Sequence, residues 1–206
     1  MSERASQPMT RPHVWLPGTG TPPLLLLHGT GGDEHDLLPL REHLAPDAPV
    51  LSPRGTVLEN GMPRFFRRLA EGVFDEDDLR ARVDELAGFV AEAPTGVPAG
   101  TWVAAGFSNG ANIASATLFR RPEVLAGAVL LAAMVPFRDG PGEADLTGKR
   151  VAVSNGRRDP MATAAHTDTL VAQLRGCGAE VAEFPHDGGH GIDAEVLPEL
   201  RAFLAG

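Results

Sequence analysis

The pentapeptide GFSNG at residues 106–110 constrains this chain more than any other stretch. It lies between an apolar run at 101–105, rich in strand formers, and a helix-like stretch at 111–119. A G-x-S-x-G sequence between a strand and a helix is the pattern of a nucleophile elbow. Such a turn strains the serine backbone, and flanking glycines remove side chains that would collide with the neighbouring strand or helix. We therefore predict that the Ser108 hydroxyl lies at the tip of this turn.

The pentapeptide alone also fits an ordinary strand-to-helix turn with a surface serine, since the chain has 24 glycines. The surrounding pattern decides between these interpretations, because apolar runs alternate with helical periodicity. We expect strands at about residues 13–16, 24–27, 49–52, 101–105, 126–133, 149–155 and 180–184. We expect helices at about 33–44 with Asp33 as cap, 76–92, 111–119, 160–174 with Pro160 in the first turn, and 196–204 with Pro198 in the first turn. This alternation predicts an α/β fold with a mostly parallel, twisted sheet and helices on both faces.

Polar residues follow three of the expected strands, at the sheet edge where α/β proteins bind ligands. Ser108, Asp159 and His190 each come just after a strand. Their order, serine then acid then histidine, is that of the α/β-hydrolases. In that arrangement Ser108 is the nucleophile, His190 moves its proton, and Asp159 orients the imidazole.

Two of these assignments have alternatives. Asp159 precedes a helix and could simply be its cap. His186 is a rival base four residues before His190, but the glycines at 189 and 191 favour His190. His186 and His190 also have the four-residue spacing of a metal-binding histidine pair on a helix. The glycines between them argue against a helix, and no third ligand is apparent, so we predict that no metal binds here.

The glycine-rich stretch HGTGG at residues 28–32 is the candidate oxyanion loop. Its amides, chiefly that of Thr30, would join the amide of Asn109 in binding the negative oxygen of a tetrahedral intermediate. The alternative is a glycine-rich turn into a capped helix. The stretch is not a phosphate loop, because no Gly-Lys-Ser/Thr follows it. We expect His28 to be a hydrogen-bonded structural residue.

Four segments carry a specific resemblance: LLLHGTGGDE at 25–34, GFSNG at 106–110, GRRDP at 156–160 and GHG at 189–191. Together they resemble the phospholipase/carboxylesterase family of small α/β-hydrolases, over about residues 20–206. The resemblance implies a minimal hydrolase without a large cap domain, acting on carboxylic esters of small to medium acyl groups. It carries over Ser108, Asp159 and His190 as the triad, and the amides of Thr30 and Asn109 as the oxyanion hole.

The stretches SPRG at 52–55 and ENGMPRFFRR at 59–68 look like a bacterial subgroup of that family that is sometimes linked to quinone and hydroquinone detoxification. The chain departs from the family at one point. Members acting on acylated proteins or lysophospholipids often have Gln-Gly after the serine, where this chain has Asn109-Gly110. This departure weakens the transfer of long-chain or protein-thioester specificity.

The segment 56–75 reads as a long irregular connection, and such loops often line sites. We expect Phe65 and Phe66 to form an apolar wall over Ser108, with Met134 adding further apolar surface. The segment and its flank also carry arginines, which either bind an acidic substrate group or, as we favour, pair with nearby carboxylates. The arginines are Arg54, Arg64, Arg67 and Arg68, and the nearby carboxylates are Glu71, Asp75 and Asp78.

Composition limits the class of protein and its partners. A formal net charge of -9 argues against nucleic acid and anionic membranes. No signal peptide and no apolar run near the ~18 residues of a membrane span is visible. The single cysteine, Cys177, excludes an internal disulfide and favours a cytoplasmic location. We expect residues 1–11 to be a flexible leader and 12–206 to be one domain.

The leading hypothesis is a serine carboxylesterase that acts on a small-molecule ester and needs no cofactor. A thioesterase or lysophospholipase with the same triad stays open, as does assembly into a homodimer. A hypothesis from another class is a catalytically silent binding module. Such a module would be expected to lose a triad member or an elbow glycine, and this chain keeps them.

Overall fold

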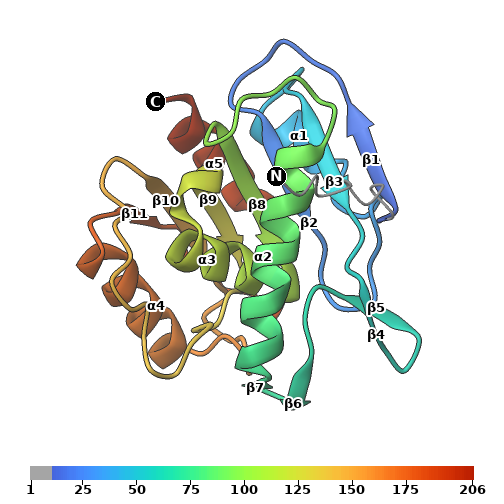
Figure 1. Cartoon of the computed structure of the whole chain (residues 1–206). Coiled ribbons are helices and arrows are strands. Elements are labelled where there is room, and N and C mark those ends of the chain that lie inside the picture. Colours follow the sequence, from blue (N-terminus) through green and yellow to red (C-terminus); the bar gives the residue numbers. More distant parts are fainter. Residues whose placement is uncertain (1–10) are drawn as a thin grey trace.

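The computed structural model describes residues 11–206, and its centre is a seven-stranded sheet (Figure 1). The strand order is β1-β3-β2-β8-β9-β10-β11. The strands are β1 (His13–Leu16), β3 (Val50–Pro53), β2 (Leu24–Leu27), β8 (Trp102–Phe107), β9 (Leu125–Leu131), β10 (Arg150–Ser154) and β11 (Glu180–Glu183). Only the β1–β3 pair is antiparallel among these neighbours. The predicted α/β class and all seven expected strands are confirmed.

Residues of β2 show why the central strands are apolar without interruption. Leu25 and Leu27 belong to the core on one face of the sheet, and Leu24 and Leu26 belong to the core on the other. Since strand side chains alternate between faces, a strand covered on both sides needs apolar residues at every position. The helices α2 (Glu76–Glu92), α3 (Asn109–Arg120) and α4 (Ala164–Gly176) supply the first face, and α1 (Leu40–Leu44) and α5 (Leu197–Ala205) supply the second (Figure 1).

Two expected helices are shorter than predicted. Residues 33–39 form successive turns, and α1 begins only at Leu40, after Pro39. Asp33 does not cap that helix, because its Oδ1 accepts the His35 N–H within the turn at 2.8 Å. Helix α4 begins at Ala164 rather than near Pro160, with Thr163 as its cap. Pro198 does lie in the first turn of α5, as expected.

The prediction of an irregular connection at 56–75 is wrong. This segment forms two small hairpins, β4 (Val57–Glu59) with β5 (Met62–Arg64), and β6 (Arg68–Ala70) with β7 (Val73–Phe74). The first turns at Asn60-Gly61, where φ is 51° and 80°. Positive φ at both central residues is the hairpin geometry that an Asn-Gly pair favours, so the signal was present in the sequence.

The flexible leader predicted for residues 1–11 lies outside the described residues except for its last member. Arg11 is buried, and its guanidinium pairs with Glu85 of α2. Short 3-10 turns at Pro122–Val124 and Ala194–Val196 complete the elements. Across residues 11–206, the helices lack the combination of length and apolar character that a membrane span requires.

Candidate active site

The turn between β8 and α3 has the geometry that the glycine spacing predicts. Ser108 adopts φ 51° and ψ −111°, and its N–H donates to Leu131 O at 2.8 Å. A Cβ on Gly106 would lie 2.5 Å from Gly110 O, and a Cβ on Gly110 would lie 1.9 Å from Leu27 O. Both distances are far inside van der Waals contact, so neither position tolerates a side chain without moving backbone. The steric reason inferred from the sequence is confirmed.

Three side chains from distant parts of the chain meet at this turn. His190 Nε2 lies 2.8 Å from Ser108 Oγ, and His190 Nδ1 lies 2.7 Å from Asp159 Oδ2. They come from the segments after β8, β10 and β11, at the carboxyl edge of the sheet. The Asp159 side chain is fully buried, whereas the His190 side chain is 23% exposed. The structure therefore brings all three predicted residues into hydrogen-bonding contact.

Asp159 does not cap helix α4, whose cap is Thr163, but it closes a turn just before that helix and also contacts the histidine. Its Oδ1 accepts the N–H groups of Met161 and Ala162 at 2.8 and 3.0 Å, which leaves Oδ2 for His190. Burial alone would raise the pKa of Asp159, but these hydrogen bonds outweigh it and lower the pKa below its ordinary value. The carboxylate is therefore ionised at neutral pH and favours the His190 tautomer that is protonated on Nδ1.

His186, the rival base, makes its contacts with Gly188 and Asp193 and not with Ser108. Its ring is buried, its Nδ1 accepts the Gly188 N–H at 3.2 Å, and the same atom is 3.6 Å from Asp193. Gly156 brings the two loops together, because a Cβ there would lie 2.3 Å from Gly189 O. His190 rather than His186 therefore faces Ser108.

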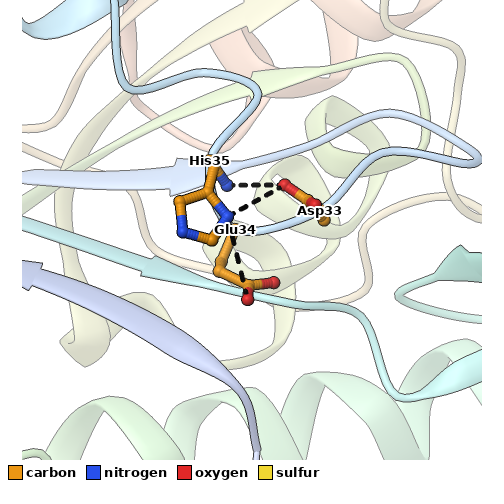
Figure 2. A group of neighbouring side chains, drawn as sticks. All are labelled: Asp33, Glu34 and His35. Carbon is orange, nitrogen blue, oxygen red and sulfur yellow. Dashed lines mark hydrogen bonds and ion pairs between the residues drawn. The ribbon is translucent and has the colours of Figure 1, made fainter.

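Among residues 11–206, three side chains with metal-ligating atoms gather within 4.8 Å of one another: Asp33, Glu34 and His35 (Figure 2). Both carboxylate oxygens of Glu34 and one oxygen of Asp33 already accept hydrogen bonds. Glu34 takes two hydrogen bonds from Arg54, and Asp33 accepts the His35 N–H. These contacts explain the cluster without an ion, and a metal-free site stays a prediction.

The two predicted oxyanion amides lie at the ends of neighbouring elements. Thr30 is exposed in the loop after β2, and Asn109 is the first residue of α3. Neither amide donates a hydrogen bond to another residue in the part of the chain that the structure describes. The loops are pressed together at Gly110, where a Cβ would lie 2.6 Å from His28 O. The arrangement leaves two backbone donors free beside the serine turn, one of them at the positive end of a helix dipole.

His28 is structural, as expected. It is buried, its Nδ1 lies 2.6 Å from Gly29 O, and its Nε2 accepts the Gly55 N–H at 2.9 Å. Both ring nitrogens are thus used, and the ring packs on Phe65 with centroids 4.7 Å apart. Burial lowers the pKa of His28, although the Gly29 carbonyl opposes that shift.

This lowered pKa predicts a pH-dependent stability. Below about pH 6.5 His28 becomes protonated in the unfolded chain, whereas in the folded chain its lowered pKa keeps it neutral to a lower pH. The free energy of unfolding should therefore fall as the pH is lowered, by at most about 1.4 kcal/mol per pH unit. His28→Gln removes the titration and should be less stable at neutral pH but less sensitive to acid. Thermal or denaturant unfolding of both proteins from about pH 7 to 5 measures the difference. Equal slopes would contradict the assignment.

The predicted pocket residues need correction. Phe65, Phe66 and Met134 are only 1%, 0% and 4% exposed, so none offers its side chain to a ligand as a wall over Ser108. Phe66 packs edge-on against Phe74 of the second hairpin at 5.0 Å. Phe65 and Phe66 lie between the two hairpins and are part of the hydrophobic core.

The arginines follow the favoured interpretation and pair with carboxylates. Arg67 contacts Asp75 and Asp78, as predicted. The others use partners that were not anticipated: Arg54 binds Glu34, and both Arg64 and Arg68 bind Glu59. Glu71 is absent from the ion pairs among the described residues.

Sequence reasoning missed two buried asparagines that shape the segment after β9. Asn155 Oδ1 accepts the Ala133 N–H at 2.9 Å, and Asn112 Oδ1 accepts the Met134 N–H at 2.8 Å. They satisfy backbone groups where the chain leaves the sheet at Ala132, which has φ 54°. The only sequence signal was a polar residue inside an apolar stretch.

The order serine, acid, histidine on a mostly parallel sheet, with the serine at positive φ between a strand and a helix, defines an α/β-hydrolase. Comparison with known proteins narrows this class. No family model matches the chain. It is 49% identical over 191 residues to MhqD of Bacillus subtilis (strain 168), which is named as a hydrolase, and the match covers 92% of this chain and 95% of that one.

Solved structures agree with this relationship. The crystal structure of the Bacillus cereus carboxylesterase is similar with a TM-score of 0.91 and 46% identity, covering 95% of this chain and 94% of that chain. The carboxylesterase from Mesorhizobium loti is similar with a TM-score of 0.83 and 32% identity, covering 89% of this chain and 88% of that chain. The chain belongs to the carboxylesterase-like family of α/β-hydrolases.

Proposed function

We propose that this chain is a serine carboxylesterase that forms an acyl-enzyme on Ser108. The observation that carries the proposal is the continuous hydrogen-bond chain from Ser108 Oγ through His190 to the buried Asp159 carboxylate. A hydroxyl in contact with an oriented imidazole is the arrangement required for nucleophilic catalysis. The names of the Bacillus cereus and Mesorhizobium loti relatives support ester cleavage as the reaction.

In the proposed acylation step, Ser108 Oγ attacks the ester carbonyl carbon while its proton moves to His190 Nε2. The amides of Thr30 and Asn109 stabilise the negative oxygen of the tetrahedral intermediate. That intermediate collapses by breaking the carbon–oxygen bond to the alcohol, which leaves with the proton from His190. Water then attacks the acyl-enzyme, giving its proton to His190, and Ser108 recovers a proton as the carboxylic acid departs.

The proposed substrate is a small-molecule ester with a small to medium acyl group. Asn109 stands where relatives acting on acylated proteins or lysophospholipids often have glutamine, which weakens the case for a long-chain or protein-thioester substrate. A thioesterase or lysophospholipase would use the same groups, so only turnover can separate these reactions. The negative net charge supports a substrate that is not a nucleic acid. The single, partly buried Cys177 supports a reducing, cytoplasmic setting.

Purified protein should hydrolyse p-nitrophenyl acetate and butyrate, with kcat in the ordinary enzyme range of about 1–10³ s⁻¹ on its preferred chain length. A panel of oxygen esters, thioesters and lysophospholipids of increasing acyl length ranks the candidate substrates. A fluorophosphonate probe should label the folded protein on Ser108, which peptide mass analysis locates. Folded protein that neither turns over an ester nor reacts with the probe would favour the binding-module hypothesis.

A further inference from the structure

Three consecutive residues, the last two of β5 and the one that follows it, contact both parts of the candidate oxyanion hole. Pro63 O accepts the Gly31 N–H at 2.9 Å, and Arg64 Nη1 donates to Thr30 Oγ1 at 2.6 Å. The Phe65 N–H donates to Asn109 Oδ1 at 2.7 Å. One short segment, residues 63–65, therefore links the loop after β2 to the first residue of α3.

Arg64 is built into this position. It is 3% exposed, its Nε donates to Phe66 O at 3.1 Å and lies 3.2 Å from Glu59 Oε2, and its guanidinium lies over the Phe66 ring. Gly55 makes room for the segment, because a Cβ there would lie 2.3 Å from Arg64 O. Burying a guanidinium costs more than burying an apolar side chain of similar size, so stability alone does not account for this residue.

The loop that Arg64 contacts is held mainly through backbone groups: the Gly32 N–H donates to Gly29 O at 3.1 Å, and the Gly29 carbonyl also lies 2.6 Å from His28 Nδ1. Thr30 is exposed between Gly29 and Gly31, and Gly31 has φ 82°. Glycine-rich backbone has many alternative conformations. A donor amide lowers a reaction barrier only if it is already fixed where negative charge develops. The Thr30 hydroxyl gives the loop a side-chain attachment, and Arg64 holds it.

We propose that Arg64 is a positioning residue, which fixes the Thr30 amide relative to the Asn109 amide through its hydrogen bond to Thr30 Oγ1. This inference rests on the proposed esterase function, because it assigns Arg64 to the oxyanion hole of that reaction. Arg64 touches no reacting atom in this role. Its effect should therefore appear in the rate of both acyl-transfer steps and not in the binding of the ester.

Arg64→Met and Thr30→Val each remove the hydrogen bond and keep the size of the side chain. Since complete loss of one oxyanion donor costs about 10²–10³ in kcat, misplacing one should lower kcat by about 10–100-fold with little change in KM. Affinity for an alkyl trifluoromethyl ketone, whose adduct with the serine carries the same oxyanion, should fall in parallel. The double variant should lose no more than about the larger single effect, because both changes break one contact.

Two matched controls separate positioning from simple stability. Arg68→Met removes the other arginine bound to Glu59. Among residues 11–206 Arg68 makes no hydrogen bond to Thr30, so this variant should keep wild-type kcat. Thr30→Ser keeps the hydroxyl acceptor, so its kcat should exceed that of Thr30→Val by about 10-fold or more. Thermal unfolding of every variant checks folding. If Arg64→Met does not fold, the contrast between Thr30→Val and Thr30→Ser decides the question.

The outcomes distinguish this inference from the function on which it rests. Folded Arg64→Met and Thr30→Val with kcat within about 3-fold of wild type would overturn the positioning role, and so would equal losses in Arg68→Met. If the positioning role is overturned, the esterase proposal still stands as long as the wild-type protein is active and Ser108→Ala is not. A wild-type protein inactive toward every ester would overturn both.

Discussion

Ser108→Ala is expected to lower kcat for p-nitrophenyl butyrate by about 10⁶-fold, the loss typical of removing the nucleophile from an intact triad. Without Oγ no acyl-enzyme forms, and His190 has no hydroxyl proton to accept. The residual rate would come from water attack near the oxyanion amides. The measurements are steady-state turnover, the burst of p-nitrophenol in the first turnover, and fluorophosphonate labelling. All three signals should disappear in the variant.

This variant should fold as well as the wild type. Ser108 Oγ contacts only His190 among the described hydrogen bonds, and alanine meets the same backbone requirement at φ 51°. Ser115→Ala is a matched control in α3, the helix that follows Ser108, where a buried hydroxyl donates to Asn112 O. The control should keep its activity. Labelling of Ser108→Ala, or turnover above about 10⁻³ of wild type, would show that another group is the nucleophile.

The serine turn and the sheet were predictable because each depends on local chemistry. An uninterrupted apolar strand such as Leu24–Leu27 indicates burial on both faces, and the alternation of strands with helices along the chain then indicates a parallel sheet covered by helices. Parallel topology then places every strand end at one edge, so Ser108, Asp159 and His190 could be expected together. Their contact is a consequence of strand order, although they are far apart in sequence.

The segment 56–75 was harder because its structure depends on partners elsewhere in the chain. The type of turn at Asn60-Gly61 is local and was overlooked, but the inward direction of Phe65 and Phe66 is not local. Phe65 is held by His28 and Asn109, and these contacts exist only after β2 and α3 have assembled. An aromatic pair in a polar stretch fits either a ligand wall or a core, and only the packing distinguishes them.

The late start of the predicted 33–44 helix has a similar cause. Apolar residues at 37, 38, 40 and 44 have helical spacing, but Pro39 cannot donate the hydrogen bond that a continuous helix needs. Local turns, including the Asp33–His35 contact, replace the first part of the helix. Side-chain bonding to nearby backbone competes with helix formation in this way.

Asp159→Asn should lower kcat by about 10⁴-fold while the fold survives. The side-chain oxygen of the introduced asparagine can keep the two hydrogen bonds from the Met161 and Ala162 amides, because they anchor one atom of the side chain. That orientation turns the amide NH₂ toward His190 Nδ1, which must then accept a hydrogen bond. The imidazole proton moves to Nε2, and a protonated Nε2 cannot accept the proton of Ser108.

The matched control for this change is Asp187→Asn, in the same loop as His190. Its carboxylate is 91% exposed and lies 3.9 Å from Arg157, so it should keep wild-type activity. Steady-state turnover and thermal unfolding separate loss of chemistry from loss of structure. In a folded Asp159→Asn protein, kcat within about tenfold of wild type would mean that the imidazole keeps its working tautomer without this carboxylate. Because the pKa of Asp159 is lowered in the folded protein, the carboxylate stays charged at neutral pH, and the variant therefore removes both a charge and a tautomer constraint.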